Sequence, residues 1–281
     1  MGMLLCRPER EPVRTEDQIT SVRRFFDRSA EAYTARSAGT RLEFSSFVFQ
    51  RRQDIVKAML PRLDSGRVLD FGMGPGVYAA HCVALGFEYL GIDTSPEMVA
   101  RARALDVPDA EFAVGGVDML WRLEEQFDVV MAIGVLDYVE PPEEGLRALC
   151  ARVKEGGYLV LSYRNRYALP SLLRDGLRHG WQALRLPQRR EAKRLFFAPI
   201  PERPFDLERE LRPVLTEEGF ADVEVRFLAC SPLFFNVPLP AAAWRRWNEL
   251  DARIARPSMR WLCLHAVLRA RKRPGVTGHR G

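Results

Sequence analysis

The sequence lacks any apolar run of the roughly 18 residues that a membrane-spanning helix requires. Its first apolar stretch, residues 3–6, is far too short for a secretory signal peptide. The five cysteines are dispersed without a CxxC pair, and the four histidines show no metal-ligand spacing. These absences exclude a secreted disulfide scaffold and a structural zinc site. They predict a soluble, cytoplasmic protein with reduced thiols and no metal.

What the chain does contain is enough apolar material for a full-sized core. Of its 281 residues, 47% are hydrophobic and 10% aromatic, so one large domain or a domain with an appendage is expected. The net charge is +5 with a pI near 9.1. That charge permits nucleic acid, anionic lipid or an acidic small molecule as a partner, and its distribution along the chain is more informative than its total.

Short apolar runs alternate with helical patterns through the middle of the chain, which predicts right-handed βαβ crossovers and a parallel, doubly wound sheet. Two helices are expected before this region and a helix with two further strands after it. The late strands have no clean crossover between them, which suggests an antiparallel strand near the sheet edge. Strands are expected at 67–71, 87–92, 110–114, 127–133, 158–163, 221–228 and 261–268, and helices at 16–35, 42–63, 75–85, 95–105, 143–154 and 207–218.

A glycine-rich loop, Asp70-Phe71-Gly72-Met73-Gly74-Pro75-Gly76, follows the first expected strand. Glycines suit a tight turn that a ligand approaches closely, and the carboxyl ends of parallel strands are the usual ligand crevice. Asp93 ends the next strand, where a carboxylate can accept both hydroxyls of a ribose. The pattern indicates a nucleotide-type cofactor. It departs from the dinucleotide pattern, whose third glycine is replaced here by Val77.

Residues 67–163 resemble the class I S-adenosylmethionine (SAM) dependent methyltransferases, which implies SAM as cofactor and S-adenosylhomocysteine (SAH) as product. The family's first motif is matched by Asp70, Gly72, Gly74 and Gly76, and its ribose-binding acid by Asp93. The resemblance implies further cofactor contacts downstream of this acid. They are Thr94 and Met98 after the second strand, Asp118 and Met119 at the adenine, and Ile133 and Gly134 near the methionine group.

Upstream, residues 25–28 followed by Tyr33 resemble the N-terminal lid helix of small-molecule members of that family. Tyr33 is therefore expected either to close over the cofactor or simply to pack two helices together.

Candidate catalytic and substrate groups follow the fourth and fifth strands. Many relatives carry a His-His pair where this chain has Asp137 and Tyr138. Asp137 is a candidate base or substrate anchor, although such an acid more often caps the following turn. Tyr163 is a second catalytic candidate, and Tyr138, Asn165 and Arg166 are candidate substrate contacts. These polar residues favour methylation at oxygen over nitrogen or carbon.

Two long segments are expected to surround the acceptor. Residues 164–194 contain nine arginines and lysines against two acids, with leucines at helical spacing. This pattern predicts a basic amphipathic helix that contacts an anionic membrane or lipid substrate, docks as a lid with solvated arginines, or contacts RNA. Few aromatics are placed for base stacking, so nucleic acid is disfavoured. The aromatic-rich segment 231–258 is expected to complete an apolar cap.

Together these patterns predict a Rossmann-like, seven-stranded, mostly parallel α/β sheet with helices on both faces and helical cap insertions. The expected segments are 1–64 (lid helices), 65–163 (SAM-binding core), 164–205 (basic insertion), 206–271 (C-terminal helix and edge strands) and 272–281 (tail). The expected function is methyl transfer to a small, hydrophobic or lipid-like molecule. The alternatives are an RNA methyltransferase and a SAM-binding regulatory protein without turnover. No pattern indicates an oligomeric state.

Overall fold

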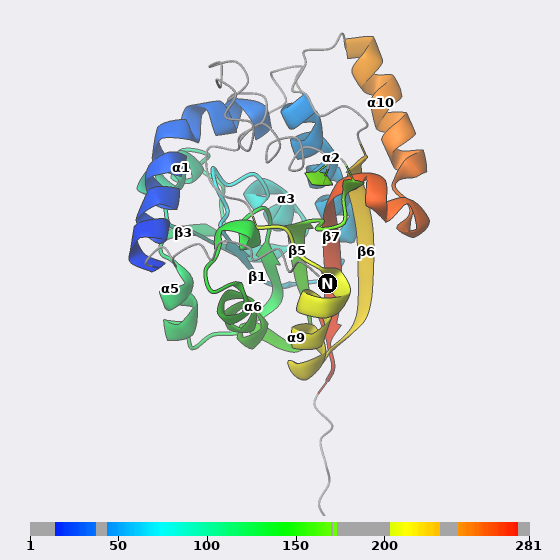
Figure 1. Cartoon of the computed structure of the whole chain (residues 1–281). Coiled ribbons are helices and arrows are strands. Elements are labelled where there is room, and N and C mark those ends of the chain that lie inside the picture. Colours follow the sequence, from blue (N-terminus) through cyan, green and yellow to red (C-terminus); the bar gives the residue numbers. More distant parts are fainter. Residues whose placement is uncertain (1–14, 38–43, 170, 173–202, 231–240, 275–281) are drawn as a thin grey trace, which may run out of the picture.

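The computed structural model describes residues 15–37, 44–169, 171–172, 203–230 and 241–274, and these form an α/β domain (Figure 1). Most of the predicted basic insertion (170 and 173–202) and part of the second excursion (231–240) lie outside the described residues. Within the described part of the chain, no helix combines the length and apolar character needed to cross a membrane.

Seven strands form one sheet in the order β3-β2-β1-β4-β5-β7-β6. β1 to β5 are parallel, and β7 runs antiparallel to both β5 and β6. The predicted doubly wound sheet is thereby confirmed. The predicted antiparallel strand near the edge is β7, and β6 lies outside it at the edge itself. The strands are β1 (Gly66–Phe71), β2 (Phe87–Asp93), β3 (Ala110–Val114), β4 (Phe127–Ala132), β5 (Val153–Arg164), β6 (Phe220–Cys230) and β7 (Cys263–Lys272).

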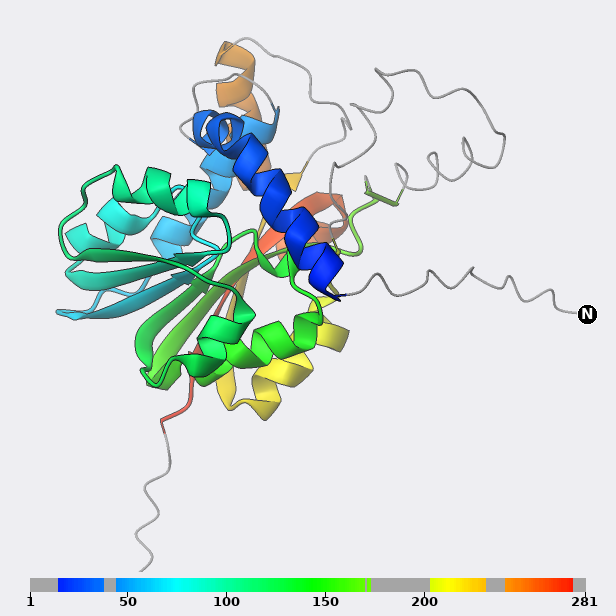
Figure 2. The same cartoon turned by 90° about the vertical axis from the view of Figure 1, so that its left-hand side faces the viewer.

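Helices cover both faces of the sheet (Figure 2). One face packs against α5 (Val117–Arg122), α6 (Pro142–Ala151) and α9 (Arg212–Glu217) through a large apolar cluster. The other face packs against α2 (Phe44–Met59) and α3 (Ala79–Ala84), and α4 (Pro96–Arg103) packs on Phe112 beside them. The remaining elements are α1 (Thr15–Ser37), α10 (Ala241–Ile254), the 3-10 turns η1 (Leu136–Tyr138) and η3 (Pro257–Leu262), and the π-helical turn η2 (Leu207–Leu211).

Local chemistry explains where the helices begin and change. Ser95 caps α4 as predicted, since its Oγ accepts a hydrogen bond from the Met98 backbone N–H at 3.2 Å. The helix expected at 75–85 begins only at Ala79, because the residues before it still belong to the glycine loop. The helix expected at 207–218 divides into η2 and α9. Pro213 lacks the N–H that an unbroken α-helix would use there.

The cysteines differ in state. Cys82 and Cys150 are buried free thiols, as expected. Cys263, at the start of β7, is disulfide-bonded, so the prediction that all five cysteines are reduced thiols is wrong for this residue.

Candidate functional site

The loops that follow β1, β2 and β4 meet at the carboxyl edge of the sheet around a hollow of about 480 Å³ that opens to solvent. We call this the cofactor hollow. α1 contributes Val22, Phe26 and Tyr33 to its lining, so this helix and the loops form the hollow together. Eight of its lining residues are among the predicted site residues: Tyr33, Gly72, Gly74, Asp93, Thr94, Met98, Gly134 and Tyr138. The lining also includes five residues that the sequence did not single out as individual site residues: Val22, Phe26, Phe71, Gly115 and Val135.

The glycine loop is shaped by close backbone contacts. Gly72 has a φ of +71°, and a Cβ added there would lie 2.5 Å from Cγ2 of Val135, so only glycine fits. The Gly74 backbone N–H donates to Oδ2 of Asp93 at 2.9 Å. The loop therefore turns tightly over the end of β1 and is held by the acid that ends β2.

Asp93 joins two backbone segments at the cofactor hollow. Its Oδ1 accepts a hydrogen bond from the Ser95 N–H at 2.9 Å, while Oδ2 accepts from Gly74. Burial raises the pKa of Asp93, and these two hydrogen bonds oppose the rise. Each oxygen retains further acceptor capacity, so the carboxylate can still accept hydroxyl donors from a ligand.

Asp70 is more deeply buried, with 1% of its surface exposed. Its Oδ2 accepts a hydrogen bond from the Tyr89 hydroxyl at 2.7 Å, whereas Oδ1 has no partner among the residues that the structure describes. Burial raises the pKa of Asp70 to about 7, Tyr89 opposes this rise, and Asp93 adds to it. No positive charge among the described residues lowers the pKa of Asp70, so its Oδ1 is available to a cationic group of a ligand.

A second hollow, of about 310 Å³, adjoins the first and shares Tyr33 and Gly72 with it. We call it the inner hollow. Asp70 lines it together with Arg52, which is 9% exposed and stacks on Phe49 at 4.8 Å. Nε of Arg52 is also without a partner in the described part of the chain. A free carboxylate oxygen and a free guanidinium nitrogen in one hollow match the two ends of an amino acid zwitterion.

Sequence reasoning missed Arg52, although a signal was present. It lies on the apolar face of α2, four residues after Val48 and four before Val56. An arginine at such a position must find a partner inside the fold, because burying an unpaired charge is costly.

Polar and aromatic contacts hold α1 against the loops of the cofactor hollow. The Ser95 hydroxyl donates to Oδ1 of Asp27 at 2.5 Å. The Phe26 ring lies 5.4 Å from that of Tyr138 and 6.0 Å from that of Tyr33, which in turn contacts Phe49 at 4.9 Å. Tyr33 thus lines both hollows and also packs α1 against α2, while its closing over the cofactor stays a prediction.

Three of the predicted cofactor residues, Gly76, Asp118 and Met119, do not line either hollow. Gly76 faces Ala102 of α4, and a Cβ there would lie 3.1 Å from the Ala102 Cβ. Met119 packs against Gly115, whose backbone lines the cofactor hollow. Asp118 is exposed and pairs with Arg122 at 3.6 Å. Ile133, by contrast, lines the inner hollow.

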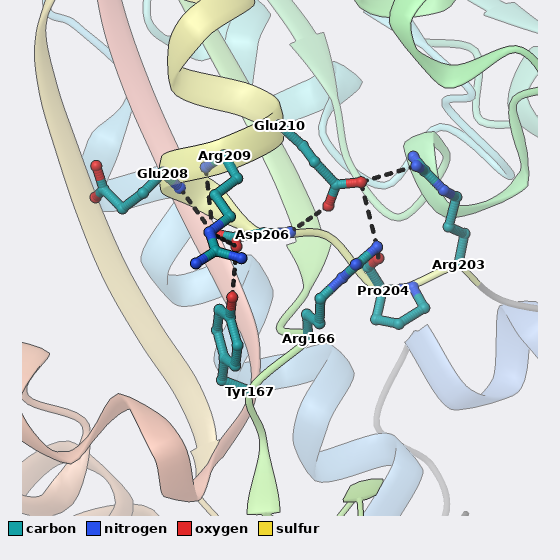
Figure 3. Close-up of polar contacts among 8 residues, drawn as sticks. All are labelled: Arg166, Tyr167, Arg203, Pro204, Asp206, Glu208, Arg209 and Glu210. Atoms are coloured by element: carbon teal, nitrogen blue, oxygen red, sulfur yellow. Dashed lines mark hydrogen bonds and ion pairs between the residues drawn. The ribbon is translucent and has the colours of Figure 1, made fainter. Parts of the chain in front are cut away.

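The predicted catalytic and substrate residues are not gathered at one place. Of this group, only Tyr138 lines the cofactor hollow. The buried Asp137 carboxylate accepts a hydrogen bond from the Arg164 N–H at 3.2 Å, a contact that favours a positioning role. Arg166 pairs with Glu210 at 3.2 Å (Figure 3). Tyr163 and Asn165 line a different hollow near β6.

A seven-stranded sheet with this strand order, and a nucleotide-type hollow beside one suited to a zwitterion, define a SAM-binding class of α/β protein. The model of the methyltransferase domain family matches residues 44–225. The chain belongs to this family, which confirms the predicted class I SAM-dependent methyltransferase with SAM as its methyl donor.

Curated relatives and solved structures agree with this assignment. The chain is 33% identical over 140 residues to the mitochondrial ubiquinone biosynthesis O-methyltransferase of Schizosaccharomyces pombe, covering 48% of each protein. It is 33% identical over 120 residues to the ubiquinone biosynthesis O-methyltransferase of Alkalilimnicola ehrlichii, covering 41% of this chain and 48% of the relative. The chain therefore spans about half the length of the curated relatives that it matches.

The fold is similar to magnesium protoporphyrin IX methyltransferase from Synechocystis PCC 6803, solved with bound SAH. The TM-score is 0.59 at 18% identity, covering 90% of this chain and 99% of that one.

Proposed function

We propose that this protein transfers the methyl group of SAM to a hydroxyl of a small, apolar or amphipathic molecule. The observation that carries the proposal is the pair of adjoining hollows, in which Asp93 lines one while Asp70 and Arg52 line the other. The named O-methyltransferase relatives support oxygen as the acceptor atom.

The residues fit each end of SAM. Asp93 has the remaining acceptor capacity to bind ribose hydroxyls at the cofactor hollow. In the inner hollow, Oδ1 of Asp70 is free to accept a hydrogen bond from the amino group, and Arg52 can bind the carboxylate. Met119 packs against Gly115, which lines the cofactor hollow, and this contact supports the assignment of Met119 and its neighbour Asp118 to the adenine end.

When bound, SAM would supply a methyl group on a positively charged sulfur. Transfer would break the sulfur–methyl bond, form the oxygen–methyl bond, leave neutral SAH and release the hydroxyl proton to solvent, to which the cofactor hollow opens. The chain's own contribution is then mainly to hold donor and acceptor in line and to exclude water. α1 with Phe26 and Tyr33 covers the cofactor hollow, and Tyr138 presents its side chain to it. We assign Tyr138 to orient the acceptor hydroxyl and Asp137 to hold the end of β5 through Arg164.

The test is product analysis with SAM that carries a deuterated methyl group. A panel of catechols and a matched panel of primary aromatic amines are offered as acceptors, and we expect the labelled methyl group on oxygen. Tight SAH binding without any labelled product would favour the regulatory alternative, and label on the amines alone would overturn the oxygen assignment.

We further propose that the basic insertion contacts the anionic, cytoplasmic face of a membrane. Its support is the excess of arginine and lysine in residues 164–194 and the exposure of Tyr167, Leu169 and Leu172 where the insertion begins. Flotation with vesicles of phosphatidylglycerol and phosphatidylcholine tests this idea. We expect binding that falls with salt and with Leu169→Ser plus Leu172→Ser, and equal flotation on purely zwitterionic vesicles would contradict it.

A further inference from the structure

A third hollow, of about 980 Å³, lies between η2, β6 and η3. None of its lining residues lines the cofactor hollow or the inner hollow, so it is a separate space. Tyr163, Phe227, Leu207 and Trp261 contribute its apolar surface, and Arg209 and Arg260 contribute guanidinium groups. Figure 3 shows four of its lining residues, with Asp206 in contact with the Tyr167 hydroxyl, the Glu208 backbone and Arg209.

Tyr163 provides a buried polar group without a partner. Tyr163 is 1% exposed, and its hydroxyl has no hydrogen-bond partner among the described residues. Burial raises the pKa of Tyr163. The negative charges of Glu208 and Asp206 add to this rise, and the positive charges of Arg260 and Arg212 oppose it. The hydroxyl is therefore protonated at neutral pH and available to donate. An unmet buried donor is costly, and a ligand oxygen would satisfy it.

The hollow is lined by two acids, Asp206 and Glu208, and two arginines, Arg209 and Arg260, which are not all paired with one another. Asp206 accepts from the Tyr167 hydroxyl at 2.6 Å and lies 3.8 Å from Arg209 (Figure 3). Glu208 pairs with Arg212 at 2.8 Å. Arg260 has no carboxylate within ion-pair distance in the part of the chain that the structure describes. Arg260 is exposed, lines the same hollow as Tyr163, and its charge acts on the Tyr163 hydroxyl, so it is available to a ligand anion there.

The wall of the hollow is aromatic. Trp261 is 44% exposed and Tyr167 is 43% exposed, both at its lining, while Phe227 is buried behind them. Exposed aromatic faces beside buried apolar side chains suit a flat apolar ligand, because they gain free energy when the ligand displaces water.

We propose that this hollow is a second small-molecule site, which binds a planar apolar molecule that carries one carboxylate. The carboxylate accepts hydrogen bonds from the Tyr163 hydroxyl and from the Arg260 guanidinium, and the planar body lies against Trp261. Both polar groups are donors, so a neutral amide, which presents N–H groups of its own, fits less well. The site stands apart from the methyl-transfer site and does not depend on the reaction assigned to it.

The experiment is calorimetric titration of the full chain with 2-naphthoate and with 2-naphthamide, which share the same ring system. We expect saturable naphthoate binding with a Kd on the order of 1 mM or lower, and at least about fivefold weaker binding of the amide. Excess SAH should leave the naphthoate Kd unchanged. Equal binding of the two probes, no saturation, or displacement by SAH would overturn the proposal without any variant.

Variants then locate the site. Tyr163→Phe removes only the hydroxyl and should weaken naphthoate binding about tenfold, and Arg260→Gln should abolish the preference for naphthoate over the amide. Arg256→Gln is the matched control, because Arg256 does not line the hollow. SAH affinity, measured in parallel, reports whether each variant is folded. An unchanged naphthoate Kd in both folded variants would refute the assignment.

Discussion

The Asp70→Asn substitution tests whether the buried carboxyl group that lines the inner hollow ionises in the folded protein. The amide has the same shape, and its oxygen can still accept the hydrogen bond from Tyr89. What changes is that residue 70 can no longer ionise. In the wild type, burial raises the pKa of Asp70 from 3.8 to about 7, so the folded protein disfavours the carboxylate that the unfolded chain forms freely.

The sign and size of the effect follow from this shift. Because the folded-state pKa is raised, the stability that the protonated carboxyl contributes is fully present below pH 3.8. It declines as the pH rises and is lost once the pH passes about 7. At about 1.4 kcal/mol per pKa unit, the complete change is about 4 kcal/mol, of which about 2 to 3 kcal/mol falls between pH 5 and pH 8.

Urea unfolding of the cofactor-free protein measures this difference. We expect the free energy of unfolding of Asp70→Asn, relative to that of the wild type, to increase by about 2 to 3 kcal/mol between pH 5 and pH 8. The exposed carboxyl of Glu111, changed to glutamine, is the matched control and should show no such gain. A constant stability difference between the two pH values would refute the reasoning, because Asp70 would then not ionise in this range.

The same variant separates stability from binding. SAH binding should weaken about 10- to 100-fold at pH 8, because a charge-assisted hydrogen bond to the amino group is lost. Binding of 5′-methylthioadenosine, which lacks the amino acid group, should stay unchanged. At pH 6 wild-type SAH binding should release about 0.9 proton as Asp70 ionises, and calorimetry in two buffers of different ionisation enthalpy would detect this.

Three further predictions concern neighbouring groups. Arg52→Met should weaken SAH binding about 10- to 100-fold in calorimetry, with Arg62→Met on the surface as control; an equal loss for 5′-methylthioadenosine would contradict a carboxylate contact. Tyr33→Ala should speed SAH dissociation about tenfold in stopped-flow measurements, because the ring lines both hollows. Asp137→Asn should keep kcat within about threefold, because an amide oxygen can still accept from Arg164; a loss of about 100-fold or more would make Asp137 a base.

The sheet and the cofactor hollow were predictable because their signals are local. Apolar runs gave the strands, and the glycine loop with Asp93 gave the crevice at their carboxyl ends. Arg52 was missed because its neighbours in the hollow, Asp70 and Ile133, come from other parts of the chain.

The acceptor-side prediction was less complete for a geometric reason. Successive residues of a strand face opposite sides of a sheet, so Tyr163 and Asn165 share one face while Ser162 lies on the other, where its Oγ accepts from the Gly134 N–H at 2.8 Å. Position after a strand fixes the edge at which a side chain lies. It does not fix the hollow that the side chain enters.

The match to the methyltransferase domain begins at residue 44, seven residues after α1 ends. The helix that covers the cofactor hollow thus lies outside the residues that the family model matches, and the Ser95–Asp27 hydrogen bond and the Phe26–Tyr138 ring contact hold it against the matched domain. Under the proposed function, α1 therefore adds Val22, Phe26 and Tyr33 over a cofactor held mainly by the matched domain. Substitutions in α1 are expected to change how quickly SAH leaves without removing a residue of that domain.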